Sequence, residues 1–302
     1  QIFGKYEIEN VEKRAVFITG CDTGFGNLMV LRCLKRGMPV FAGCLTEKGA
    51  QGLREQSKTL PGKLDTIIID VSNDESVTNA AQYLEKACQK YGGLHGFVNN
   101  AGISGTTIFD DLLNVNDYKK VTEVNTFGMI RVTQALKHLV KQTRGRIVTV
   151  TSCAGRVAMS GMGPYHVSKF AANAYCDVVR QELSHFGVSL HVIEPGFYRT
   201  NMVDEQNVQK ELDVCWNAAP DRVREEYGEK YFYDYRSKFL KMVLSVASTD
   251  LDIVIDAYLH ALIGRFPQLK YQCGGDAKFA HIPLSYLCTG LRDALYRIIV
   301  KV

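Results

Sequence analysis

Short apolar runs alternate with longer amphipathic stretches over the first 200 residues of the chain. The runs are rich in β-branched residues and nearly free of charge, which is typical of strands buried on both faces of a sheet. The stretches between them carry apolar residues at helical spacing. We therefore expect a parallel sheet with helices on both faces. The six predicted strands span residues 15–19, 38–44, 64–69, 94–98, 146–151 and 188–193.

The predicted helices fill the gaps between these strands. A first helix follows the glycine-rich stretch after residue 19 and ends near Arg36. Four more span residues 46–57, 73–90, 117–141 and 165–186. Beyond residue 248 we expect a helix at 249–264 capped by Thr249, a seventh strand at 270–273 and an amphipathic helix at 284–299.

Three charged residues interrupt this last helix, Arg292, Asp293 and Arg297, so it cannot span a bilayer. It can dock on the protein body or lie against a membrane surface, and we favour docking. The sequence contains no signal peptide and no apolar run of about 18 residues. Since the chain begins with Gln1 rather than Met, we expect a segment upstream.

Composition excludes several functional classes. Lys and Arg number 36 against 32 Asp and Glu, and a net charge of +4 without a basic run argues against a nucleic-acid partner. The 9 cysteines form no C-x-x-C pair and no metal-ligand spacing. We therefore expect reduced thiols, no disulfide framework and no metal site.

Residues 199–245 are both charged and aromatic. The aromatic side chains are Trp216, Tyr227, Tyr231, Phe232, Tyr233, Tyr235 and Phe239. We expect helices here, and two interpretations remain open: a wall for an apolar substrate, or ordinary helix packing. Position in the chain favours the wall.

The first strand runs directly into Gly20, Gly24 and Gly26 and then into a helix. Such a turn lets the backbone approach a pyrophosphate, and the free N–H groups of the helix N-terminus attract it. Tight turns also need glycine, so the trio alone is weak. Other polar or glycine motifs end later strands, at Asp70, 99–102, Ser152 and 195–196. Ligands of such sheets bind outside these carboxyl ends, so the agreement in position predicts one site.

Tyr165 and Lys169 stand four residues apart in a predicted helix, on one face. A nearby cation favours the phenolate, so we expect Lys169 to lower the pKa of Tyr165 from its usual value near 10. Ser152, at the end of a strand, can hold a substrate oxygen while the phenol gives or takes its proton.

Together these motifs resemble the short-chain dehydrogenase/reductase family. The matching residues are Thr19-Gly-x-x-x-Gly-x-Gly26, Asn99-Asn-Ala-Gly102, Asn125, Ser152, Tyr165-x-x-x-Lys169 and Pro195-Gly196 with Thr200. The phrases FITGCDTGFGN, AGCLTEKGA, IEPGF and GGDAKF resemble the retinol and hydroxysteroid dehydrogenase branch. A mitochondrial 3-hydroxybutyrate dehydrogenase shares FAGCL.

The resemblance implies an α/β fold, a Rossmann-type doubly wound, mainly parallel seven-stranded sheet in a single domain with a C-terminal helical substrate lid. We expect a lead-in at 1–13, a dinucleotide-binding catalytic core at 14–200 and a substrate-covering helical segment at 201–248. Residues 249–302 would complete the core and end in the amphipathic helix.

The resemblance also implies a role for each matching residue. Tyr165 would be the general acid/base, Lys169 would lower its pKa and hold the nicotinamide ribose, and Ser152 would bind the substrate oxygen. Asn125 would anchor a water next to Lys169, although it can also be a plain helix residue. The expected cofactor-binding residues are Gly20, Gly24, Phe25, Gly26, Asp70, Val71, Asn99, Ala101, Gly102, Tyr165, Lys169, Pro195, Gly196 and Thr200. Asp70 can instead cap the following helix.

The choice between NAD and NADP is less direct. NAD-binding folds usually have an acid at the end of the second strand, but here the strand ends at residues 43–46 without one. Thr23 is not basic, which removes one usual contact with a 2′-phosphate. Members of the resembling branch mostly use NAD, so we favour NAD, while Lys48 keeps NADP open.

The predicted function is NAD-dependent interconversion of an alcohol and a carbonyl on a lipid-like substrate, a retinoid or a hydroxysteroid. One alternative is a small hydroxy-acid dehydrogenase of the 3-hydroxybutyrate type, for which Arg199 or Arg236 would supply the cation. The other is a non-catalytic, cofactor-binding lipid carrier. We also expect a homodimer or higher homo-oligomer. The resemblance implies an endoplasmic-reticulum membrane anchor ahead of Gln1, with a mitochondrial location as the alternative.

Overall fold

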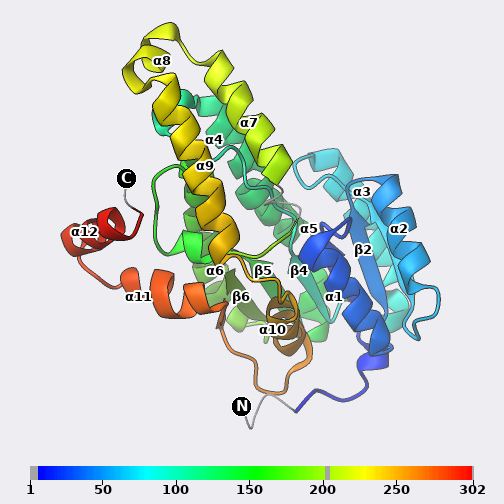
Figure 1. Cartoon of the computed structure of the whole chain (residues 1–302). Coiled ribbons are helices and arrows are strands. Elements are labelled where there is room, and N and C mark those ends of the chain that lie inside the picture. The colour runs from blue at the N-terminus through cyan, green and yellow to red at the C-terminus, as the bar shows by residue number, and fades with distance from the viewer. Residues whose placement is uncertain (1–5, 201–204, 301–302) are drawn as a thin grey trace.

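The computed structural model describes residues 6–200 and 205–300 of the chain (Figure 1). Within these residues, seven strands form one sheet in the order β3-β2-β1-β4-β5-β6-β7, and every neighbouring pair is parallel. The strands are β1 (Val16–Thr19), β2 (Val40–Cys44), β3 (Leu64–Ile68), β4 (Gly96–Asn99), β5 (Arg146–Val150), β6 (Ser189–Pro195) and β7 (Lys270–Cys273). The predicted fold class and all seven predicted strands are confirmed.

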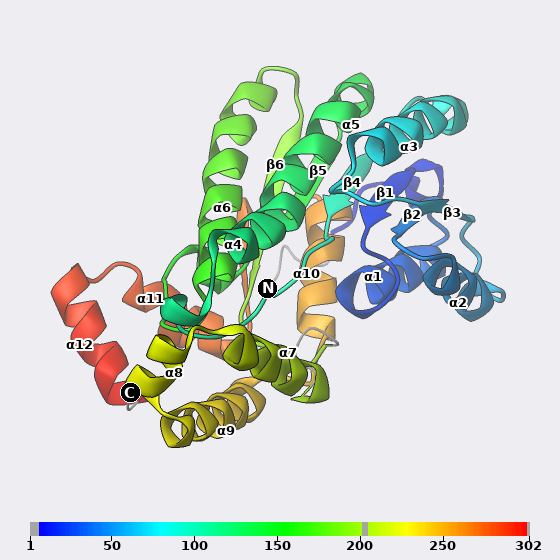
Figure 2. The ribbon, with the colours of Figure 1, turned by 90° about the horizontal axis from the view of Figure 1, so that it is seen from above.

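Helices cover both faces of the sheet, as Figure 2 shows from above. One layer consists of α1 (Gly24–Lys35), α2 (Glu47–Ser57) and α10 (Asp252–Ile263). The opposite layer consists of α3 (Asp74–Ala87), α5 (Met129–Thr143) and α6 (Gly163–Ser184).

Successive residues of β1 contribute alternately to the core layers on the two faces of the sheet. Val16, Phe17 and Ile18 are all 0% exposed. Val16 and Ile18 pack in the layer of α1 and α10, whereas Phe17 packs in the layer of α5 and α6. Because successive side chains of a strand point to opposite faces, a central strand must be apolar at every position. This is why the strands read as continuous apolar runs.

Strand order reverses at β1, which pairs with β2 on one side and with β4 on the other. The loops that leave β1 and β4 meet at this point. Gly20 has φ +69°, and a Cβ on it would lie 2.8 Å from the Cα of Ala101. The glycine-rich turn therefore lies at the topological switch point, where open α/β sheets bind ligands.

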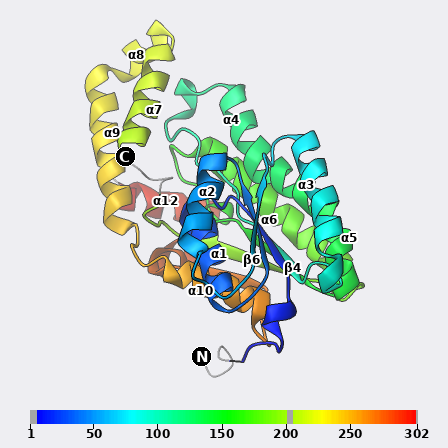
Figure 3. The same cartoon turned by 90° about the vertical axis from the view of Figure 1, so that its right-hand side faces the viewer.

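Three helices stand together at the top of Figures 1 and 3, beside α4 (Val115–Thr122). They are α7 (Glu205–Ala218), α8 (Asp221–Tyr227) and α9 (Glu229–Val246). They form the helical part of the predicted covering segment, of which 201–204 lie outside the described residues, as do 1–5 of the lead-in. The boundaries of the four predicted segments stay a prediction.

Two expected helices differ from the structure at their ends. Thr249 does not cap α10, which begins at Asp252 after Leu251 without a side-chain cap. The single helix expected at 284–299 is wrong, because α11 (Ile282–Leu284) ends before α12 (Thr289–Val300) begins. The amides of Tyr286 and Leu287 bond three residues back and tighten the chain into turns. No helix among the described residues is both long and apolar enough to cross a membrane.

The close approach at Gly20 predicts a stability difference between two glycines. Gly92 has a similar φ of +74°, but no atom lies within 4 Å of the position of its Cβ. Gly92→Ala should cost about 1 kcal/mol of unfolding free energy for backbone strain alone, and Gly20→Ala about 1–3 kcal/mol more. Urea denaturation of both variants measures this. Equal costs would contradict the contact with Ala101.

Candidate active site

Tyr165 and Lys169 lie on the first turns of α6, which Pro164 helps to begin. The Lys169 ammonium lies 5.5 Å from the centre of the Tyr165 ring. It donates a hydrogen bond of 3.1 Å to the carbonyl of Val150, the last residue of β5. Lys169 is only 5% exposed, so α6 holds a cation against the carboxyl end of the sheet.

Ser152 lies directly beyond β5 and contacts the same phenol. Its hydroxyl is hydrogen-bonded to Tyr165, donates to the carbonyl of Pro195 at 3.2 Å and accepts from the amide of Ala154 at 3.1 Å. The structure therefore brings together Ser152, Tyr165 and Lys169 from β5 and α6. These are a hydroxyl, a phenol and an ammonium, the groups needed to hold an oxygen and move its proton.

Burial shifts both titratable groups toward their neutral forms. It raises the pKa of Tyr165 to about 12, and the hydrogen bond with Ser152 lowers it by less. Burial also lowers the pKa of Lys169 to about 8. We expected Lys169 to lower the pKa of Tyr165, but within the chain alone desolvation wins, because it penalises the phenolate. At neutral pH Tyr165 is therefore a proton donor beside a cation.

Asn125 lies in a π-helical turn, Glu123–Gly128, that joins α4 to α5. Its Oδ1 accepts from the amide of Ile103 at 2.8 Å, and its Nδ2 donates to the Ile103 carbonyl at 2.9 Å and to Ser168 Oγ at 3.0 Å. Asn125 thus clamps the loop after β4 onto α6. A Cβ on Gly102 would lie 3.1 Å from Asn125 Oδ1 and 3.8 Å from Lys169 Nζ. Gly102, Asn125 and Lys169 therefore lie next to one another. The water-anchoring role of Asn125 stays a prediction.

The glycine-rich turn leaves the start of α1 open. Thr23 precedes α1 and makes no side-chain cap hydrogen bond, whereas side chains cap α2, α3 and α4. The first amides of α1 can therefore bind an anion such as a pyrophosphate. Gly24 has φ +63°, and a Cβ on it would meet only Thr200, at 4.0 Å. These residues fit a dinucleotide.

Two expected cofactor residues of this turn are used inside the protein. The Phe25 ring packs edge-on against Tyr198 and Tyr258, at 5.5 and 6.3 Å between ring centres. A Cβ on Gly26 would collide with the Gly20 carbonyl, so Gly26 closes the turn. The Phe25 ring and the Cβ position of Gly26 therefore face the protein itself, and cofactor contacts of these two residues stay predictions.

The loop after β4 is held to β1 by Asn100, which we had not singled out. Its Nδ2 donates to the carbonyls of Thr19 at 2.9 Å and Gly20 at 3.1 Å, and its Oδ1 accepts from Tyr258 Oη at 3.0 Å. The Thr19 hydroxyl in turn accepts from the amide of Ala101 at 3.1 Å. The sequence does not show which loops face each other. It therefore cannot distinguish the role of Asn100 from that of its neighbour Asn99.

Asn99 points away from this loop. Its Nδ2 donates to Thr133 Oγ1 on α5 at 2.9 Å, so its side chain is used in the core. Asp70 forms a local turn, with Oδ1 accepting from the amide and hydroxyl of Ser72 at 2.9 and 2.6 Å. The cap of α3 is Asn73, not Asp70. Val71 is buried in the core. Cofactor contacts of these three residues stay predictions.

Asp276, also missed, shapes the loop after β6. Its Oδ2 accepts from the amide of Phe197 at 2.7 Å, and a Cβ on Gly196 would collide with its carboxylate. The only signal was the stretch GGDAKF, which contains Asp276. Asp276 therefore holds Gly196, which follows Pro195, the hydrogen-bond partner of Ser152, in place.

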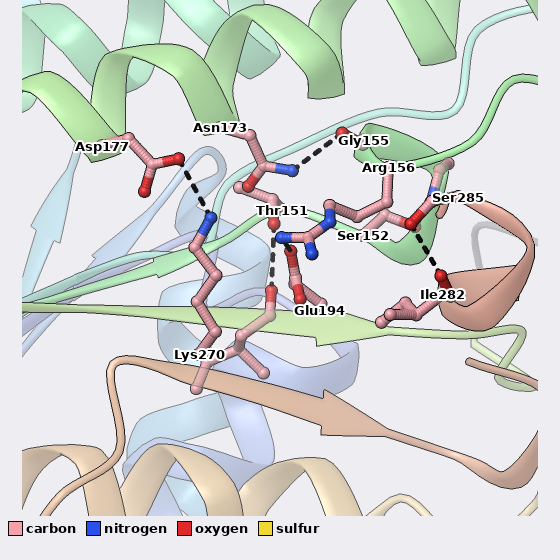
Figure 4. Close-up of polar contacts among 12 residues, drawn as sticks. Thr151, Ser152, Gly155, Arg156, Asn173, Asp177, Glu194, Lys270, Ile282 and Ser285 are labelled. Atoms are coloured by element: carbon pink, nitrogen blue, oxygen red, sulfur yellow. Dashed lines mark hydrogen bonds and ion pairs between the residues drawn. The ribbon is translucent and has the colours of Figure 1, made fainter. Parts of the chain in front are cut away.

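A polar network supports the turn that follows Ser152 (Figure 4). Glu194 is 0% exposed and pairs with Arg156 at 3.4 Å. Asn173 donates to the Gly155 carbonyl at 3.0 Å. His166, beside the tyrosine, contacts the carbonyl of Ala154 and accepts from the Met159 amide, so it is structural. These contacts hold the turn that follows Ser152 against α6 and β6.

Aromatic residues of α9 pack over this region. The rings of Phe109 and Tyr235 lie 4.3 Å apart, and Trp216 stacks on Phe232 at 4.5 Å. The Tyr235 hydroxyl lies against Gly161, in the loop between Ser152 and Tyr165. Trp216 and Phe232 are buried and pack helix against helix, whereas Tyr235 reaches the loop between Ser152 and Tyr165.

Both arginines expected to attract a small acid have a partner within the chain. Arg199 donates to the carbonyl of Leu244 at 2.9 Å, and Arg236 pairs with Asp213 at 2.5 Å.

Comparisons with known proteins agree with this geometry. A family model described as short chain dehydrogenase matches residues 14–211. Retinol dehydrogenase 16 of Rattus norvegicus is 42% identical over 96% of this chain and 89% of the relative. The 17-beta-hydroxysteroid dehydrogenase type 6 of Homo sapiens is 42% identical over 95% of this chain and 88% of the relative.

Solved structures share the fold at low identity. A short-chain dehydrogenase/reductase from Burkholderia phymatum in complex with NAD has a TM-score of 0.70 at 21% identity, covering 92% of this chain and 94% of its own. A short chain dehydrogenase from Burkholderia cenocepacia in complex with NADP has a TM-score of 0.68 at 22% identity, covering 93% and 97%.

The buried cation predicts an unusual pH dependence of stability. Lys169 has a pKa of about 8 when folded, against an ordinary 10.5, so the folded state binds its proton less tightly than the unfolded state. Below pH 8 the charge costs up to about 3 kcal/mol, and the cost shrinks from pH 8 to 10.5.

Lys169→Met should therefore stabilise the protein by about 1–3 kcal/mol near neutral pH, with the gain fading above pH 8. Denaturant unfolding at several pH values measures it, with the exposed Lys86→Met on α3 as control. A pH-independent difference, or one equal to the control, would show that Lys169 is not a buried cation.

Proposed function

The chain belongs to the short-chain dehydrogenase family of oxidoreductases acting on CH–OH groups, and we propose that it interconverts an alcohol and a carbonyl on a lipid-like substrate with NAD as cofactor. The observation that carries the proposal is the hydrogen bond between Ser152 and Tyr165 with Lys169 one helical turn away. The finer steps below follow from these three residues.

Each residue has a distinct task in the proposed reaction. Ser152 binds the substrate oxygen, and Tyr165 Oη exchanges a proton with that oxygen. Lys169 keeps a positive charge beside the phenol. A bound nicotinamide dinucleotide supplies the hydride acceptor or donor. In reduction Tyr165 gives its proton, which suits its raised pKa; in oxidation it must first become phenolate.

The cofactor would be held by the elements around the switch point. The open amides of α1 would bind its pyrophosphate, and Gly24 and Thr200 would border it. Lys169 would contact the nicotinamide ribose. The structural neighbours include complexes with NAD and with NADP. We favour NAD because Thr23 offers no positive charge to a 2′-phosphate.

Two observations support a retinoid or hydroxysteroid as substrate. The relatives named above are retinol and hydroxysteroid dehydrogenases, and α9 brings Tyr235 to the catalytic loop. The hydroxy-acid alternative is weakened, since Arg236 is paired with Asp213 and Arg199 is hydrogen-bonded to the carbonyl of Leu244. A non-catalytic lipid carrier does not require Ser152, Tyr165 and Lys169 to lie together, so this alternative does not explain their arrangement. Endoplasmic-reticulum membrane association and homo-oligomer formation stay predictions.

Removal of the phenol oxygen of Tyr165 should stop turnover. Tyr165→Phe should lower kcat by at least about a thousandfold, because the proton carrier is lost, yet change NADH affinity by less than about threefold. NADH absorbance measures turnover and fluorescence measures binding. Tyr175→Phe, on the same helix but hydrogen-bonded to Thr133, is the matched control and should keep activity. Retained turnover in Tyr165→Phe would reject the assignment.

A substrate panel separates the two enzyme classes. With NAD, kcat/KM for retinol or an androstanediol should exceed that for 3-hydroxybutyrate by at least about a hundredfold, because apolar walls favour the larger molecules. A preference for 3-hydroxybutyrate would favour the small hydroxy-acid alternative.

A further inference from the structure

The end of β2 lacks the acid that NAD-binding sheets usually place there, but a carboxylate reaches this point from another loop. Asp22 belongs to the glycine-rich turn after β1. Its Oδ2 accepts from the amide of Leu45 at 2.8 Å. Its Oδ1 accepts from the amide of Thr46 at 3.0 Å and from the Thr46 hydroxyl at 2.7 Å. Leu45 and Thr46 directly follow β2, which ends at Cys44.

We propose that Asp22 replaces the missing acid of β2 and makes the protein select NAD against NADP. This inference rests on the proposed function, namely that the chain binds a nicotinamide dinucleotide. NADP differs from NAD by a phosphate on the 2′-oxygen of the adenosine ribose, and in this fold that oxygen lies at the end of the second strand. A carboxylate there repels the phosphate, whereas it can accept a hydrogen bond from a 2′-hydroxyl.

The carboxylate is held in place from two sides. Thr46 is the N-cap of α2, and its hydroxyl accepts from the Gly49 amide at 3.0 Å while it donates to Asp22. A Cβ on Gly49 would collide with Asp22 Oδ1, so α2 packs directly on the carboxylate. A carboxylate offers about four acceptor positions, and the three donors named above leave one for a ribose hydroxyl.

No cation neutralises Asp22 in the part of the chain that the structure describes. The nearby Arg54 pairs with Glu47 and donates to Thr66 Oγ1 at 2.5 Å. Lys48, which kept NADP open in the sequence, has an exposed side chain and no ion pair with Asp22 among the described residues. Asp22 also adds to the effect of burial in raising the pKa of Cys44 to about 12. Within the described ranges, Asp22 therefore presents a carboxylate without an ion-pair partner at the end of β2.

Nucleotide binding, measured without turnover, tests the proposal. NADH and NADPH are titrated separately into the wild-type protein, Asp22→Asn, Asp22→Ser and Glu47→Gln, with fluorescence or calorimetry as readout. The wild type should bind NADH at least about tenfold more tightly than NADPH. Asp22→Asn and Asp22→Ser should shrink that ratio about tenfold or more, chiefly by tightening NADPH.

Glu47→Gln is the matched control, because it removes a carboxylate at the same end of the sheet that is already paired with Arg54. It should leave the ratio within about twofold. Asp22→Ser keeps a hydroxyl acceptor for the amides after β2, and a thermal melt confirms that each variant is folded.

Three outcomes would overturn the proposal: equal or tighter NADPH binding by the wild type, an unchanged ratio in both Asp22 variants, or the same change in Glu47→Gln. Each of these leaves the dehydrogenase assignment intact if alcohol turnover persists. Failure of the folded wild type to bind either nucleotide would instead remove the proposed function and the Asp22 proposal together.

Discussion

Burial of a phenol and an ammonium side by side is the constraint on which the site depends. Desolvation opposes charge on both groups, so it raises the pKa of Tyr165 to about 12 and lowers that of Lys169 to about 8. Lys169 remains mostly charged at neutral pH, and its hydrogen bond to Val150 fixes the ammonium in place. The protein alone therefore stabilises the proton-donating form of Tyr165. The phenolate needs a second positive charge nearby, and an oxidised nicotinamide ring carries one. In the proposed reaction, alcohol oxidation and cofactor binding would thus be coupled electrostatically.

The scaffold keeps this pair at the carboxyl ends of the strands. Ser152 follows β5, and its partner Pro195 ends β6. Each of these loops is held by a polar contact. The buried Glu194 pairs with Arg156 behind the first loop, and the partly buried Asp276 accepts from the Phe197 amide at the second. Because an unpaired buried charge is costly, the pair of Glu194 and Arg156 allows little rearrangement of the first loop. The parallel sheet supplies the frame, and the polar contacts position the hydroxyl of Ser152 relative to Tyr165.

Much of the fold could be predicted from the sequence, because burial is periodic and periodicity is visible. The continuous apolar run at β1 indicated a central strand, and the spacing of Tyr165 and Lys169 placed them on one helix face. Contacts between distant segments leave no such pattern. Asn99 and Asn100 are adjacent residues of the same type. Asn99 hydrogen-bonds Thr133 in the core, whereas Asn100 joins β1 to the loop after β4. Asp22 reaches the end of β2 from the glycine-rich turn, and Asp276 reaches Phe197 from a position 79 residues further along the chain. The break between α11 and α12 was equally invisible, since apolar spacing continues through it.

The electrostatic coupling at Tyr165 can be measured directly. Tyrosine labelled with carbon-13 at Cζ reports its own ionisation by NMR, and comparison with Tyr165→Phe assigns the signal. We expect Tyr165 to titrate near pH 12 in the protein alone. On addition of NAD its pKa should fall toward neutrality, while NADH, whose ring is uncharged, should cause a much smaller change. An equal response to NAD and NADH, or none to either, would contradict the account.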